Sequence, residues 1–300
     1  MIPRHISSSP PRSFNRSGFT LIELSLVLVI ISMITGAIIG GQALIQQARI
    51  QHLISDVNSY KTAINVFQTQ YAAYPGDFSN AYAYFAKANN DNICGPSVGD
   101  IRWSCNGNGD GILGYDPTGE QESIAEGTRA WIHLDLADIL HKVTYQPGGF
   151  YGCVNTVKGK CGGSSPPNVP LSALNNLTGF IISNPRNFTG TYYGRTGAWL
   201  TLTMPGDPDV SGTWGGTNIQ AYLFNRSITP TIAQYIDKKF DDGLPTTGDV
   251  LATSPWDNST LCTTAGVEGA AIGTTMPSRT FLYNVSNTTN QCTLLFYIGG

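Results

Sequence analysis

The sequence is short of charge. Only 12% of its 300 residues are Asp, Glu, Lys or Arg, and the formal net charge is -3. No block dense in Lys and Arg occurs beyond the N-terminal residues, which argues against a nucleic-acid-binding protein and against a polybasic membrane-surface segment. The length suffices for one large domain or two small ones with a buried core, and length by itself does not choose between them.

The sequence also lacks the motifs by which many enzymes are recognised. It contains no Gly-x-Ser-x-Gly elbow, no phosphate-binding loop and no dinucleotide fingerprint, and its cysteines show no paired Cys-x-x-Cys spacing. His133 and His141 are eight residues apart, which is not the i, i+4 spacing of a helical zinc pair. We therefore expect a protein that is not an enzyme and that requires no cofactor.

One long apolar run is present. Phe19 to Gly41 holds 23 residues with a single charge, Glu23, and a helix rising about 1.5 Å per residue would carry it across a bilayer core of about 30 Å. Three arginines and no acidic residue precede the run, which indicates that the N-terminus stays in the cytoplasm. A cleaved secretory signal is the alternative, but its apolar core is shorter, about 7 to 15 residues, and carries no charge.

The glutamate inside this run needs a physical explanation. A lone carboxylate in lipid costs several kcal/mol unless it is protonated or paired, and no cationic side chain lies one helical turn from Glu23. Its partner is therefore expected from elsewhere. A cut between Gly18 and Phe19 would expose an α-ammonium group, and the ammonium of a neighbouring copy could then pair with Glu23 in an assembly. The alternative is that Glu23 reaches the lipid headgroups near the cytoplasmic end of the span.

The residues around this bond resemble a known signature. Gly18 followed by FTLIE, with Phe19 and Glu23 in register, is similar to the N-terminal signal of type IV prepilins and type II secretion pseudopilins. The resemblance implies that a prepilin peptidase cuts after Gly18 and N-methylates Phe19, and that Glu23 acts in assembly. The chain then divides into a leader at 1-18, a transmembrane segment at 19-41, an amphipathic half of the helix at 42-74 and a globular head at 75-300.

A helical stripe follows the apolar run. Apolar residues recur three or four positions apart, at Ile50, Leu53, Val57, Tyr60, Ile64, Phe67, Tyr71 and Tyr74. The stripe predicts a helix that ends at Tyr74-Pro75-Gly76. It would suit a coiled coil or packing on a sheet, and its tyrosines and the large head favour the sheet. The fold that the resemblance implies is α+β and pilin-like, with one long N-terminal helix packed on an antiparallel sheet.

The head is rich in Gly, Asn, Ser, Thr and Pro. Strand-like runs occur at 179-183, 198-204, 219-224, 279-285 and 292-300, and one helix is expected at 129-141. Four segments of the head also resemble a subset of pilin-like proteins. They are YPGDF at 74-78, a Cys-bounded Asn/Gly/Asp loop at 94-116, a RAWxHL helix at 129-134 and DDGLPTTG at 241-248.

All six cysteines follow the apolar run, on the side that would be translocated into an oxidising compartment. Proximity in the sequence suggests the disulfides Cys94-Cys105, Cys153-Cys161 and Cys262-Cys292, although six cysteines allow fifteen pairings. Each bridge would close a short surface loop.

Two groups of oxygen-bearing residues are candidates for calcium. Asn106, Asn108 and Asp110 alternate as in a calcium loop and could act with Asp116, but the usual bidentate glutamate is missing, and a tight turn is the alternative. A second acidic group consists of Asp237, Asp241, Asp242 and Asp249. Calcium near the C-terminal part of the sheet is what the resemblance to pseudopilins implies there, and capped turns are the alternative.

These observations predict a structural subunit of a type IV pilus or a type II secretion pseudopilus. The size of the head favours a minor or specialised subunit. Expected partners are prepilin peptidase, other pilin or pseudopilin subunits, the inner-membrane assembly machinery and membrane lipid. The expected location is the bacterial inner membrane, with a single span and a periplasmic head, and then the filament. The alternative is a membrane-anchored adhesin or ligand-binding module that uses the helix only as an anchor.

Overall fold

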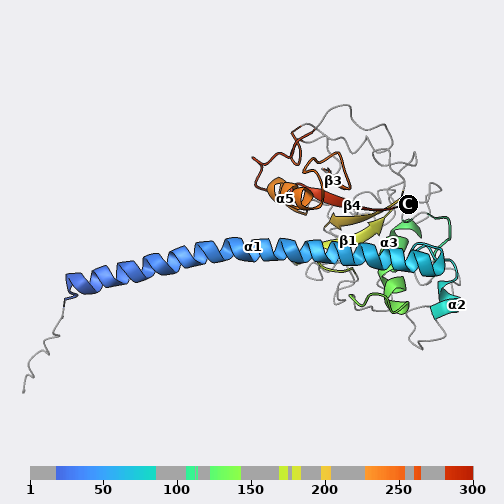
Figure 1. The fold of residues 1–300 in the computed structure, drawn as a ribbon, viewed down its shortest axis with the longest axis horizontal. Coiled ribbons are helices and arrows are strands. Elements are labelled where there is room, and N and C mark those ends of the chain that lie inside the picture. Colours follow the sequence, from blue (N-terminus) through green and yellow to red (C-terminus); the bar gives the residue numbers. More distant parts are fainter. Residues whose placement is uncertain are drawn as a thin grey trace, which may run out of the picture. The chain divides into compact units, whose positions relative to one another are not determined.

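The structure is a computed structural model, and it describes residues 18-85, 106-111, 113, 122-142, 169-174, 178-183, 197-203, 227-253, 260-264 and 281-299. The chain divides into two compact units, residues 1-48 and 49-300, with the boundary inside the first helix. In the described residues the fold is α+β and pilin-like. It has a long N-terminal helix, shorter helices and a four-stranded antiparallel sheet (Figure 1).

Helix α1, Leu21–Tyr71, begins at a capping box and ends at a left-handed residue. The backbone N–H and the hydroxyl of Thr20 both donate to the Glu23 carboxylate, and the Glu23 N–H donates to the Thr20 hydroxyl. At the other end Ala72 has a φ of 53°, and Pro75 follows. The helix therefore stops shortly before the predicted end at Tyr74.

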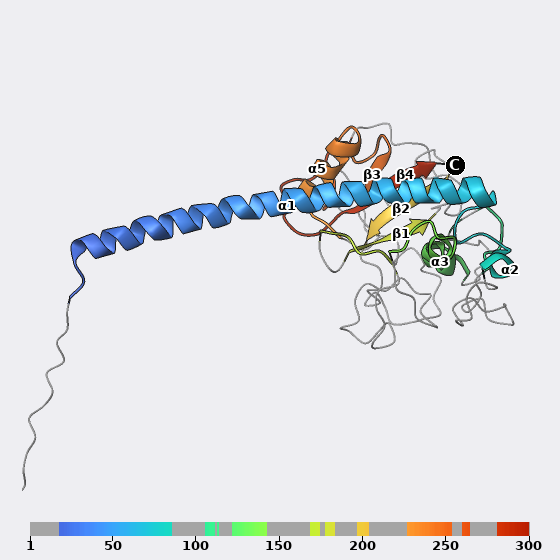
Figure 2. The same ribbon diagram turned by 60° about the horizontal axis from the view of Figure 1, so that its bottom comes forward.

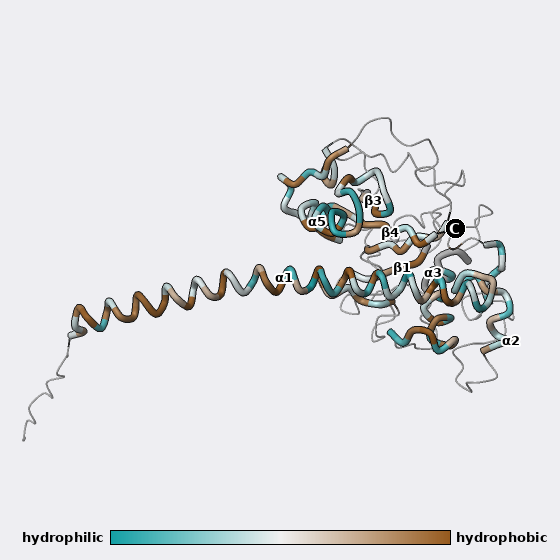
Figure 3. The backbone as a smooth tube through the Cα atoms, in the orientation of Figure 1, coloured by the Kyte–Doolittle hydropathy of each residue, from teal (hydrophilic) through white to brown (hydrophobic). Residues whose placement is uncertain are grey.

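The first half of α1 has no core of its own. Its side chains from Leu21 to Ile45 are exposed almost throughout, and Figure 3 shows that this half is mainly hydrophobic. It contains a stretch long and apolar enough to cross a membrane, the one such helix in the described residues, and none of that stretch is buried. Because its apolar side chains are exposed, the first half of α1 needs lipid or other helices around it.

The second half of α1 belongs to the head and forms part of its core. The six stripe residues Ile50, Leu53, Val57, Tyr60, Ile64 and Phe67 are buried, while Tyr71 and Tyr74 are half-buried. The Tyr60 ring lies 5.2 Å from Phe180 of strand β1, Gly179–Ser183, and 5.1 Å from Trp131 of helix α3, Glu122–Leu136. The stripe thus packs on the sheet and a helix of the head, as the tyrosines favoured.

The sheet has the strand order β1-β2-β4-β3. Its strands are β1 Gly179–Ser183, β2 Ala198–Thr203, β3 Val250–Thr253 and β4 Thr293–Gly299. The register places Leu200 and Val250 on either side of Phe296, and Leu202 and Ala252 on either side of Leu294. These cross-strand neighbours lie on one face of the sheet and join the core. Figure 2 shows the second half of α1 running beside the sheet of the head.

The structure confirms three of the expected strands, at 179-183, 198-204 and 292-300. The run at 219-224 lies outside the described residues. The strand expected at 279-285 is wrong in its described part, where Tyr283 makes one isolated bridge to Thr263. Strand β3 was not predicted, because four residues are too few to show a clear alternation.

The expectation of a single helix in the head was wrong. The described residues also form α2, Ala81–Phe85, and α5, Pro230–Phe240, which starts at the N-cap Thr229 and has Pro230 in its first turn. The helix expected at 129-141 is α3, Glu122–Leu136, and it ends early. The cause is a turn in which Asp138 has a φ of 58° and the N–H groups of Ile139 and Leu140 both donate to the Leu134 carbonyl.

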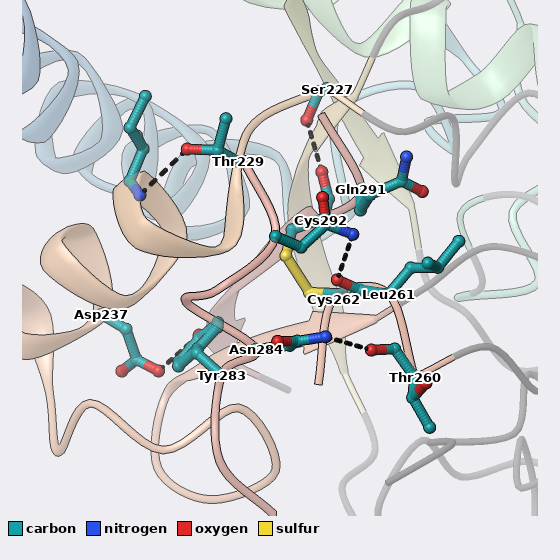
Figure 4. The surroundings of a disulfide bond; sticks show 12 residues. Ser227, Thr229, Asp237, Thr260, Leu261, Cys262, Tyr283, Asn284, Gln291 and Cys292 are labelled. Carbon is teal, nitrogen blue, oxygen red and sulfur yellow. Dashed lines mark hydrogen bonds between the residues drawn. A yellow bond between two sulfur atoms is a disulfide. The ribbon is translucent and has the colours of Figure 1, made fainter. Parts of the chain in front are cut away.

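A disulfide joins Cys262 to Cys292, with a Cα–Cα distance of 5.0 Å, and both residues are buried (Figure 4). Cys292 directly precedes β4, and its carbonyl accepts from the Ser227 hydroxyl. The bridge therefore ties the 260-264 segment to the start of a central strand. The suggested pairs Cys94-Cys105 and Cys153-Cys161 lie outside the described residues and stay predictions.

Candidate functional site

The bond between Gly18 and Phe19 lies in exposed, non-helical chain directly before α1. The Phe19 side chain is 88% exposed. Nothing lies within 4 Å of the position that a Cβ of Gly18 would take, so the fold of the described chain does not require a glycine there. The bond is thus accessible to a peptidase, and the glycine has to be explained by something outside the described fold. Residues 1-17 lie outside the described residues.

Glu23 has hydrogen-bond donors within its own chain, and its charge pairing with the ammonium group of a neighbouring copy stays a prediction. The Thr20 N–H is 2.8 Å and the Thr20 hydroxyl 2.9 Å from the same carboxylate oxygen. A backbone amide and a hydroxyl are neutral donors, so they satisfy the oxygen without cancelling its charge. The sequence signal for this contact is Thr-x-x-Glu ahead of an apolar run, which is a capping box.

In the head, three of the segments with a resemblance to pilin-like proteins meet around Asp77. The turn at Tyr74 to Phe78 contributes its carboxylate, and the 106-111 loop folds over it. The Gly109 N–H lies 2.7 Å from one carboxylate oxygen of Asp77, and the Gly111 N–H lies 3.0 Å from the other. The backbone amides of the loop therefore converge on a negative charge that belongs to the protein itself.

Helix α3 closes this site from the other side. The Glu126 carboxylate accepts from the Asn108 N–H, and the Gly76 N–H donates to Nδ1 of the buried His133 at 2.7 Å. His133 is thus a hydrogen-bonded helix residue, and its ring stacks on Phe67. Gly76 has a φ of 96°, and a Cβ there would lie 2.2 Å from the Glu126 carbonyl oxygen.

The acids of this site are perturbed mainly by burial. Removal from water raises the pKa of Asp77 to about 6, and the hydrogen bonds from the backbone amides of Gly111 and Gly109 oppose that rise. Burial likewise raises the pKa of Glu126 to about 8, opposed by the bond from Asn108. The two acids and the backbone amides of the loop thus form a hydrogen-bonded network inside the head.

A second acidic group surrounds the C-terminus of α5. The buried Asp237 carboxylate accepts from the Tyr283 hydroxyl at 2.7 Å (Figure 4). It also accepts from the Gly243 N–H at 3.2 Å. Burial raises the pKa of Asp237 to about 7. Asp241 accepts from the N–H groups of Asp249 and Val250 and holds the DDGLPTTG segment against β3.

The two calcium predictions can be placed on this geometry. In the first loop, the side-chain oxygens of Asn106 and Asn108 accept from the N–H groups of Tyr82 and Asp110, and Asp116 lies outside the described residues. In the second group, Asp237, Asp241 and Asp242 each have a carboxylate oxygen within 4.8 Å of the others. In both places a side-chain oxygen also accepts from a backbone N–H two residues on, which fits the tight turn and the capped turns given as alternatives, and calcium binding stays a prediction for each.

The comparisons with known proteins bear on the N-terminal segment. Residues 13-39 match the family model of the prokaryotic N-terminal methylation motif. The chain therefore carries the type IV pilin and pseudopilin signal, placed over the exposed Gly18-Phe19 bond and the start of α1. Searches of curated proteins and of solved structures found no match.

Proposed function

We propose that the chain is a structural subunit of a type IV pilus or a type II secretion pseudopilus, cut after Gly18 and N-methylated at Phe19. The observation that carries the proposal is the exposed, non-helical Gly18-Phe19 bond at the start of a capped apolar helix, inside the methylation motif. The partners follow from the same reading. They are prepilin peptidase, other pilin or pseudopilin subunits, the inner-membrane assembly machinery and membrane lipid.

The first half of α1 supports assembly through this helix. Its large apolar side chains are exposed in a single copy, so they need lipid before assembly and neighbouring helices afterwards. Gly36, Gly40 and Gly41 have open space at the position of a Cβ, so one chain alone gives no reason for three glycines there. Close packing of helices from neighbouring copies would supply that reason.

Glu23 takes two partners in succession in this proposal. In the membrane-inserted precursor, Thr20 satisfies its carboxylate with two neutral hydrogen bonds. After the cut, the new ammonium group of Phe19 from a neighbouring copy adds an opposite charge, which neutral donors cannot provide. Assembly then removes the free-energy cost of holding the uncompensated charge of Glu23 in lipid.

The head lies in the periplasm in this proposal and later on the surface of the filament. The disulfide fits an oxidising compartment. We also propose a minor or specialised role for the subunit, based on the size of the head. No observation on the described residues favours catalysis, and the proposed role is not enzymatic.

The first test is the intact mass and N-terminal sequence of the protein extracted from membranes that contain prepilin peptidase. We expect a chain that begins at Phe19 and carries one additional methyl group. The same protein from cells without the peptidase should begin at Met1. A chain that begins at Met1 in both, or that is cut at another bond, would contradict the proposal.

The second test is incorporation into filaments. Glu23→Gln keeps the size and removes the charge, so it should lower incorporation strongly while leaving the cut after Gly18 intact. Ser32→Ala is the matched control, because the Ser32 hydroxyl donates to the Leu28 carbonyl of its own helix. Normal incorporation of Glu23→Gln would refute charge pairing. Equal binding of a head ligand by assembled and unassembled subunits would instead favour the membrane-anchored adhesin.

A further inference from the structure

A hollow of about 570 Å³ lies in the head beside the C-terminal end of α1. Its walls come from the last turn of α1, from the YPGDF turn and from the 106-111 loop, and they include Gln68, Tyr71, Phe78 and Asp77. The proposed filament role makes no use of it. Its volume falls within the range of ligand pockets.

One wall of the hollow is aromatic. The rings of Tyr71 and Phe78, which both line the hollow, lie 5.4 Å apart, and Tyr84, which is not a lining residue, lies 6.1 Å and 5.3 Å from them. Tyr84 is 65% exposed, although it sits in the aromatic cluster at the end of the helix. Aromatic faces of this kind attract organic cations and also stack on apolar groups.

The hollow has a negative electrostatic environment. It lies at the C-terminus of α1, where the carbonyl end of the helix dipole is negative, and the last turn of that helix contains no basic residue. Asp77 is one of the lining residues, and the negative charge of Asp110 nearby raises the pKa of its carboxylate further. Burial raises the pKa of the neighbouring Glu126 to about 8, so at neutral pH this side chain is mostly protonated and the negative field comes from Asp77 and the helix end.

The form of the site favours an organic cation over a metal ion. Asp77 is 2% exposed and its oxygens already accept from Gly109 and Gly111, so it acts through its field more than as a direct ligand. A metal ion would need several oxygen ligands in direct contact, whereas an ammonium or guanidinium group can lie over aromatic rings in a negative field.

We propose that this hollow binds an organic cation, an alkylammonium or guanidinium group, with the cationic group over the rings of Tyr71 and Phe78. Such a group could come from a free amine or from a Lys or Arg side chain of another protein. The two sources share the chemistry of recognition, and the probes below separate them.

The test uses the full-length protein in a neutral detergent without choline, and titration calorimetry. The probes are N-acetyl-lysine methylamide and the same compound acetylated on its side-chain nitrogen, which differ in charge at almost constant shape. We expect the cationic probe to bind at least about tenfold more tightly. Equal binding of butylammonium would assign the site to free amines. Binding of N-acetyl-lysine methylamide without binding of butylammonium would assign the site to a lysine side chain of a protein partner.

Two pairs of variants locate the binding. Gln68→Lys places a fixed cation in the hollow and should abolish binding, whereas Asn65→Lys adds the same charge at an exposed position of α1 outside it. Tyr71→Leu should weaken binding roughly three- to tenfold. Tyr235→Leu, at a half-buried tyrosine of α5, should leave it unchanged. Similar affinity for the charged and acetylated probes, or full binding by Gln68→Lys, would overturn the proposal.

Discussion

Asp237 gives a sharp prediction about the pH dependence of folding. Its carboxylate is fully buried, and burial raises its pKa from 3.8 to about 7. Between about pH 4 and pH 7 the folded chain therefore holds a proton that the unfolded chain has released. The stabilisation is fully present below about pH 4 and is lost as the pH rises to about 7, so the free energy of unfolding falls across this window.

The expected size of the effect follows from the same values. A pKa raised from 3.8 to about 7 corresponds to at most about 4 kcal/mol, at roughly 1.4 kcal/mol for each tenfold change in proton affinity. The surrounding polar groups also stabilise the charged form when they reorient, which lowers this figure, and we expect about 2 to 3 kcal/mol. Glu126 and Asp77 contribute with the same sign, because burial raises the pKa of each.

Asp237→Asn isolates the contribution of this one group. The new amide can still accept from the Gly243 N–H and can donate to the Tyr283 oxygen, so the contacts survive while the titration disappears. We expect the fall in unfolding free energy between pH 4 and pH 7 to become smaller by about 2 to 3 kcal/mol. Asn65→Asp is the control, because it adds a carboxylate at an exposed position of α1.

The assay is urea unfolding of the full-length, oxidised protein in a neutral detergent with a metal chelator. The fluorescence of the buried Trp131 and Trp199 reports on the head. Two results would refute the reasoning. One is a wild-type stability that rises from pH 4 to pH 7, and the other is a variant whose pH dependence equals that of the wild type.

Four further predictions concern other parts of the chain. Thr20→Val removes the capping hydroxyl of α1, so hydrogen exchange at the Glu23 and Leu24 amides should become faster by an amount equivalent to about 1 kcal/mol; unchanged exchange would contradict the cap. Gly76→Ala should destabilise the head by roughly 2 to 4 kcal/mol in urea unfolding, because its Cβ would meet the Glu126 carbonyl. Gly111→Ala, with a φ of 79° but open space, should cost only about 1 kcal/mol, and equal costs would rule out the steric explanation. Replacing both Cys262 and Cys292 by Ala should lower the free energy of unfolding by roughly 3 to 4 kcal/mol, and a loss below about 1 kcal/mol would contradict the chain-entropy argument for a 30-residue separation. If calcium binds the first loop, adding Ca²⁺ should raise the melting temperature and Asp110→Asn should remove the increase; an increase lost only in Asp242→Asn would place the ion in the second acidic group, and no increase would contradict both predictions.

The long helix and much of the sheet could be predicted from the sequence because their signals are local and repeated. The helical stripe predicted the buried face of α1, and it needed only spacing to be seen. The strands at 179-183 and 293-299 are apolar runs flanked by loop-forming residues, which sequence patterns report well. The end of α1 was less certain, because Ala72 adopts a left-handed conformation that its residue type does not suggest.

The site around Asp77 could not be predicted, because it depends on contacts between segments far apart in the sequence. The Gly109 and Gly111 amides reach Asp77 across more than thirty residues, and Glu126 joins from a third segment. Backbone donors carry no signature in the sequence. The alternating Asn and Asp residues of the loop suggested ligands for a cation, whereas the described loop directs its amides at an acid.

The glycines of the chain separate what the fold requires from what only another molecule could require. A Cβ at Gly76 would meet the Glu126 carbonyl at 2.2 Å, and a Cβ at Gly107 would meet the Asp77 backbone at the same distance, so packing within the head explains both. Gly18 and Gly40 have nothing within 4 Å and no left-handed backbone, so packing within the described chain explains neither. Both lie in or directly before the apolar half of α1, where side chains are exposed. Since glycine lowers the stability of a helix by about 1 kcal/mol relative to alanine, Gly40 carries a cost that a neighbouring helix at close range would offset.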